Sequence, residues 1–128
     1  MTANLTQYAQ ETILGLFRGA PVKGPGQMYV ALLVESTVKL GEIVEVKARG
    51  YRRQSLTLGD PINGVCDNPT DILFGVAEAN WGKVVTIGVY DALTGGHLWM
   101  QSDMERPQTV EAGSPFKIPV GELSISLV

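Results

Sequence analysis

The feature that most constrains this chain is the alternation of apolar and polar residues through its C-terminal half. The clearest case is near the end of the chain, where polar residues separate three apolar ones: Leu123, Ile125 and Leu127. Val85, Ile87 and Val89 have the same spacing. Successive side chains of a strand point to opposite faces, so a period of two predicts strands with one apolar face.

Short segments of this kind recur along the chain at intervals of about ten residues, which is typical of all-β domains. The expected strands are residues 28–34, 43–48, 51–58, 72–77, 83–91, 98–102, 109–111, 116–119 and 122–128. Residues 59–69 are expected to form a long loop with a turn at Asn63-Gly64, and Gly95-Gly96 marks a hairpin connection. The sequence therefore predicts an all-β fold, a jelly-roll-like antiparallel β-sandwich, over residues 21–128.

The first twenty residues differ, because their apolar side chains follow a helical period. One stripe collects Leu5, Tyr8, Ala9, Ile13, Leu16 and Phe17. Asn4 is a suitable N-cap, and Arg18, Gly19 and Pro21 are suited to the end of a helix. We expect an amphipathic helix over residues 4–18, within a single domain, whose stripe packs on its own sheet or on a neighbouring subunit.

Composition favours assembly with neighbours. Of the 128 residues, 45% are hydrophobic and only 18% are charged, whereas soluble domains usually have about a quarter of charged residues. Some apolar surface is therefore expected to remain after folding, although a compact β domain can also simply need few charges. The net charge of −3 argues against direct nucleic-acid binding, which needs a basic surface. No segment resembles a membrane span or a secretory signal, so synthesis in a cytosol and no membrane partner are expected.

Catalytic chemistry is not indicated by any motif. The chain has one cysteine, Cys66, and one histidine, His97, and neither belongs to a cluster of catalytic residues. Oxygen ligands gather between residues 60 and 71, where they suit either calcium or the local hydrogen bonds of turns: Asp60, Asn63, Asp67, Asn68 and Asp71. We expect a protein that is not an enzyme and carries no cofactor.

Two groups of residues are candidate partner contacts. The first group is basic and surrounds Gly50: Lys47, Arg49, Arg52 and Arg53. It suits either docking to a carboxylate-rich partner or protection of an edge strand. The second group is Leu5 and Tyr8, on the expected helix.

Trp81 and Trp99 could form a sugar-binding platform, although large aromatic residues of sandwiches are more often core.

The order of these segments resembles a family of small virion proteins from tailed bacteriophages. The motifs that carry the resemblance cover nearly the whole chain: residues 14–19, 29–33, 50–53, 72–96 and 110–127. Members of this family are usually called tail fibre proteins, and some are similar to capsid cement or decoration proteins.

The resemblance implies a structural virion protein. The leading expectation is a capsid cement protein on the outer surface of the phage head. Such a protein binds across major capsid protein subunits and associates with itself as a dimer or trimer. The alternatives are a tail or tail-fibre component, which would be present in far fewer copies, and a carbohydrate-binding adsorption module, which would need an exposed Trp81 or Trp99.

Overall fold

The computed structural model describes residues 1–127 and consists mainly of strands, with one helix. The helix, α1, spans Gln7–Phe17. The strands are β1 (Thr2–Leu5), β2 (Met28–Glu35), β3 (Ile43–Glu45), β4 (Gln54–Leu56), β5 (Val65–Asp67), β6 (Ile72–Val76), β7 (Gly82–Tyr90), β8 (Leu98–Val110), β9 (Pro115–Ile118) and β10 (Ser124–Ser126).

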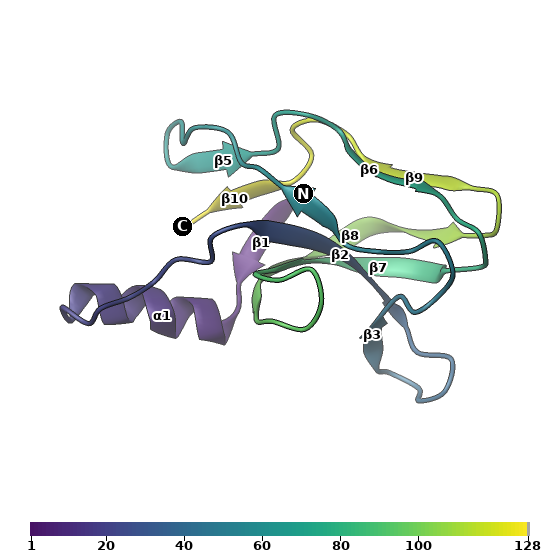
Figure 1. The fold of residues 1–128 in the computed structure, drawn as a ribbon, viewed down its shortest axis with the longest axis horizontal. Coiled ribbons are helices and arrows are strands. Elements are labelled where there is room, and N and C mark those ends of the chain that lie inside the picture. The colour runs from purple at the N-terminus through teal and green to yellow at the C-terminus, as the bar shows by residue number, and fades with distance from the viewer. Residues whose placement is uncertain (128) are drawn as a thin grey trace.

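The strands form two layers (Figure 1). The larger sheet has the order β3-β2-β7-β8-β1-β10-β5, and β4 also pairs with β2; the smaller sheet contains β6 and β9. All pairs of strands are antiparallel except β1 and β10, which run parallel with Thr2 opposite Ser124. The predicted fold class, an all-β sandwich with one N-terminal helix, is confirmed, and the parallel pair joins the two ends of the chain.

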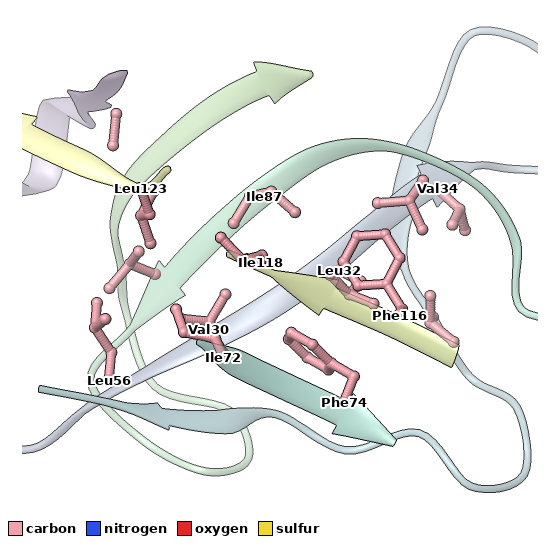
Figure 2. Packing of buried hydrophobic residues seen from close by; sticks show 14 of the residues in the cluster. Val30, Leu32, Val34, Leu56, Ile72, Phe74, Ile87, Phe116, Ile118 and Leu123 are labelled. Carbon is pink, nitrogen blue, oxygen red and sulfur yellow. The ribbon is translucent and has the colours of Figure 1, made fainter. Parts of the chain in front are cut away.

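The core lies between the two layers (Figure 2). The small sheet contributes Phe74 and Phe116, whose rings meet edge to face with centroids 5.7 Å apart. From the large sheet, Leu32 and Ile87 are almost completely buried. Residues 30–34 of β2 are all buried, which confirms that this apolar run is covered on both faces.

The helix begins later than predicted. Residues 2–5 form β1 instead, and Leu5 lies opposite Met100 of β8. The N-cap is Thr6 rather than Asn4, because the Thr6 Oγ1 accepts a hydrogen bond from the amide of Ala9 (3.3 Å) and donates one to the carbonyl of Leu98 (2.6 Å). The end of the helix is as expected, with Arg18 as C-cap and Gly19 in the left-handed region at φ 78°.

Two strand predictions were also wrong. The expected strands 98–102 and 109–111 are parts of one strand, β8, which continues past a register shift opposite residues 84–86 and ends at Val110. The expected loop 59–69 contains β5, in which Cys66 lies opposite Ile125. The turn at Asn63-Gly64 is confirmed, since both residues have positive φ and Ile62 bridges to Val65.

Other strands are shorter than expected. The regions 43–48 and 51–58 pair with β2 as strands only over β3 and β4, with one further hydrogen bond from the Val46 amide to the Leu32 carbonyl (3.0 Å), because the next residues form the segment that carries the basic group. In the last expected strand, Leu123 is fully buried but Leu127 is 70% exposed. Residue 128 of that expected strand lies outside the described residues.

Candidate interaction surface

The turn between β7 and β8, residues 91–97, is where the two predicted contact groups meet. Arg53 of the basic group contacts one side of this turn, at the carbonyls of Ala92 and Gly95. Tyr8 of the helix group contacts the other side, at His97. The turn is tight: at Gly96, with φ 75°, an added Cβ would lie 2.5 Å from Oδ1 of Asp91.

Arg53 is the most buried charged residue of the basic group, with 8% of its surface exposed. Its Nη1 donates to Ala92 and Gly95, both at 2.8 Å. Its Nε and Nη2 donate to the two carboxylate oxygens of Glu45, at 2.9 and 2.8 Å. The guanidinium also lies over the ring of Tyr90, 3.7 Å from the centroid. All these contacts lie within the molecule. Arg53 therefore holds the 91–97 turn against Glu45 and Tyr90, and we call this arrangement the Arg53 clamp.

Tyr51 extends the clamp into the large sheet. Its hydroxyl accepts a hydrogen bond from the amide of Leu32 (3.1 Å) and donates one to Glu45 (2.5 Å). Burial and the hydrogen bond to Glu45 raise the pKa of the Tyr51 phenol. Burial opposes ionisation of Glu45, but the hydrogen bonds from Arg53 and Tyr51 outweigh it and hold the pKa of Glu45 below its usual value.

The other three basic residues, Lys47, Arg49 and Arg52, are exposed in the segment between β3 and β4. Arg49 lies in a turn and not on a strand. Its carbonyl accepts a hydrogen bond from the Trp81 indole (3.1 Å). Whether these three residues contact a partner stays a prediction.

On the helix side, an aromatic cluster attaches α1 to the turn. The Tyr8 ring stacks on His97, with centroids 4.2 Å apart, and meets Trp99 edge to face at 5.3 Å. Asp91 accepts hydrogen bonds from the backbone amide of His97 (2.8 Å) and from the Trp99 indole (3.0 Å). These two hydrogen bonds hold the pKa of Asp91 below its usual value.

Tyr8 therefore has an internal role, although 40% of it is exposed, and Leu5 is half-buried in β1. Sequence reasoning missed Glu45, Tyr51, Asp91 and His97. Of these four residues, only Asp91 had a role that the sequence pattern indicates, because an acidic residue before a Gly-Gly turn commonly accepts hydrogen bonds from that turn.

The far end of α1 carries the most exposed apolar side chains of the helix. Phe17 is 80% exposed, Leu14 60% and Leu16 57%, whereas Ala9 near the start is fully buried. In Figure 1 the helix extends away from the sheet at one side of the molecule. The predicted apolar stripe thus packs on the sheet only through its first half.

A second apolar surface lies beside the small sheet. A groove of about 570 Å³ is lined mostly by apolar side chains, among them Leu73, Val76, Met104 and Phe116. Leu73 and Val76 point outward from β6 and are 61% and 57% exposed. This surface is remote from α1 in Figure 1.

The oxygen-rich segment 60–71 has a structural role at Asn68, which is 1% exposed. Its side-chain amide donates to the carbonyls of Thr70 and Pro119, and its side-chain oxygen accepts from the amide of Leu123. Asp71 accepts from the amide of Val120 (2.8 Å). Among residues 1–127, no group of three or more His, Cys, Asp or Glu side chains could hold a metal ion.

Both tryptophans belong to the interior, with Trp81 3% and Trp99 6% exposed. The sugar-binding alternative required an exposed indole, so burial removes its support. Within residues 1–127, no helix is long and apolar enough to cross a membrane.

The fold and its exposed surfaces define a small β-sandwich with a laterally attached helix and two separate exposed apolar surfaces. The chain belongs to the family described as podophage GP4 fiber I protein gp80, whose model matches residues 4–126. It is thus a structural protein of the phage virion, which confirms the resemblance to small phage proteins with a tail-fibre designation. No curated protein matches the sequence.

Proposed function

We propose that this protein is a small structural subunit of a phage fibre assembly, and that it joins its neighbours in the particle by non-covalent contacts. The observation that carries the proposal is the exposed apolar end of α1, where Phe17 and Leu14 are 80% and 60% exposed. Exposed apolar side chains that cluster on one element of a soluble domain are typical of contact sites.

The family description supports a fibre location. Of the two locations expected from the sequence, this is the alternative, a tail or tail-fibre component, rather than a cement protein on the head. Residues 1–127 form one β-sandwich rather than a shaft, so within a fibre this domain would act as a joint or base element.

The second candidate is the capsid cement or decoration protein, bound to the major capsid protein on the outer surface of the head. The groove beside β6 and β9 favours it, because a subunit that laps across a seam needs two separate contact surfaces. In both candidates the protein associates with itself and needs no cofactor, membrane or nucleic acid.

A non-enzymatic role is part of this proposal. The two carboxylates with lowered pKa, Glu45 and Asp91, both accept internal hydrogen bonds that position the 91–97 turn. Perturbed pKa values also occur in structural ion-pair networks, and here the geometry of the hydrogen bonds accounts for them.

Copy number distinguishes the two candidates. We expect quantitative mass spectrometry of purified particles, scaled to the major capsid protein, to find a few copies to a few dozen copies of this chain. Labelling with an antibody should then place it at the tail. Hundreds of copies per particle, with label over the head, would contradict the fibre location and support the cement role.

A further inference from the structure

The outward face of α1 has the spacing of a helix-pairing seam. Gln10, Leu14 and Phe17 follow one another at intervals of four and three residues, as core positions of a heptad do. All three side chains are exposed. Ala9 and Ile13 lie beside this row rather than on it; Ala9 is buried and Ile13 half-buried, so the helix attaches to β1 and β8 through a neighbouring face.

Two opposite charges flank this seam on the same side. Glu11 and Arg18 are seven residues apart, so they lie one heptad apart along the same edge of the helix. The side chain of Glu11 accepts a hydrogen bond from the neutral amide of Gln7 (3.2 Å). The ion pairs found within residues 1–127 involve neither Glu11 nor Arg18.

We propose that a second copy of this chain covers the end of α1, forming a two-fold symmetric, antiparallel helix pair. This inference rests on the proposed function and names a partner for the same contact site. In this pair Leu14 of each copy packs on Phe17 of the other. Glu11 of each copy then lies beside Arg18 of the other, which gives two equivalent ion pairs.

The charges select the antiparallel arrangement. In a parallel pair, both copies of Glu11 would lie at one level and both copies of Arg18 almost two helical turns away, so neither charge would meet its opposite. Only the antiparallel pair brings both charges to opposite partners while it buries Leu14 and Phe17.

Such a contact is small, because α1 has only 11 residues. We expect a dimer with a dissociation constant of roughly micromolar or weaker in solution, since small interfaces bind weakly. Within a particle, subunits held close together have a high effective concentration, and the same contact becomes stable.

Charge reversal tests the pairing. Glu11→Arg or Arg18→Glu alone replaces two attractions with two repulsions, so each should weaken the dimer roughly tenfold or more by sedimentation analysis of the full chain. The double variant exchanges the charges and should restore the wild-type dimer. Glu42→Arg is the matched control and should leave dimerisation unchanged: it makes an equal charge change at an exposed position directly before β3, which lies apart from α1 in Figure 1.

The second arm of the experiment removes the apolar side chains of the seam. Leu14→Ser and Phe17→Ser should each leave only monomer at concentrations where the wild type is dimeric, with an unchanged circular dichroism spectrum. Leu40→Ser removes a still more exposed leucine elsewhere and should have no effect. A monomeric wild type, or a double charge variant as weak as the single ones, would overturn the proposal. These readouts use purified protein, so they fail or succeed independently of where the protein lies in the particle.

Discussion

At the scale of single residues, the basic group divides into two kinds of side chain. Arg52 is exposed, whereas Arg53, the next residue, is 8% exposed and makes all its hydrogen bonds inside the molecule. The difference comes from acceptors that surround Arg53: the carboxylate of Glu45 and the two carbonyls of the 91–97 turn. Without them, burial of a guanidinium would be strongly unfavourable.

We expect Arg53→Ala to lower the free energy of unfolding by roughly 3 kcal/mol, because it leaves a half-buried Glu45 and two carbonyls without their donor. Arg52→Ala, a change of the same type at an exposed position, should change it by about 0.5 kcal/mol or less. Chemical denaturation at neutral pH measures both values. Equal effects for the two variants would contradict the assignment of Arg53 as the clamp.

At the scale of the elements, α1 is an attachment rather than part of the sandwich. Its first turn is held by Thr6 and by the stacking of Tyr8 on His97, and its second half extends past the sheet. The pairing of β1 with β8 determines where the helix can begin, because the amide of Thr6 still donates to the Trp99 carbonyl of β8 (2.9 Å) and the helix starts at the next residue, Gln7. This attachment orients the exposed end of α1.

Thr6→Ala should lower the free energy of unfolding by about 1–2 kcal/mol, because it removes both the N-cap and the hydrogen bond to the Leu98 carbonyl. Asn4→Ala, which removes the cap that the sequence suggested, should cost about 0.5 kcal/mol or less at its exposed position. Thermal or chemical unfolding of the two variants is the measurement. A larger loss for Asn4→Ala would mean that the helix begins earlier than described.

At the scale of the whole molecule, two contacts from opposite sides hold the 91–97 turn, and both depend on an ionised carboxylate. Glu45 anchors it through Arg53, and Asp91 anchors it through His97 and Trp99. The 91–97 turn also connects α1 to the large sheet, because Tyr8 of the helix stacks on His97. Ionisation of these two groups is therefore coupled to the stability of the entire fold.

Stability should decrease in acid. The folded state lowers the pKa of both Glu45 and Asp91, so their contribution is complete above the pKa values of the unfolded chain, about 4. It is lost as the pH falls further, through the lower folded-state values. We expect urea unfolding midpoints to be constant from pH 7 to 5 and to decline below pH 4. Asp91→Asn should make this decline shallower, and Asp60→Asn, at an exposed carboxylate, is the control; an unchanged slope in Asp91→Asn would contradict the coupling.

The sequence alone was enough for those parts of the local structure that neighbouring residues determine. Alternation of apolar and polar residues predicted the sandwich, the run at 28–34 predicted a doubly covered strand, and Asn63-Gly64 predicted a turn with positive φ. These features follow from side-chain periodicity and backbone sterics, which act over a few neighbouring residues and can be read in order along the chain.

Only the tertiary structure decided what distant residues do to one another. The predicted start of the helix belongs to β1, and the loop 59–69 contains a strand that pairs with β10. Arg53 is buried, although the other residues of the basic group are exposed. Each change depends on partners far away in the chain, such as Leu98 for Thr6, Ile125 for Cys66 and Gly95 for Arg53. Hydrogen bonds and burial between such segments have no periodicity in the sequence, so they become visible only when the folded chain brings those segments together.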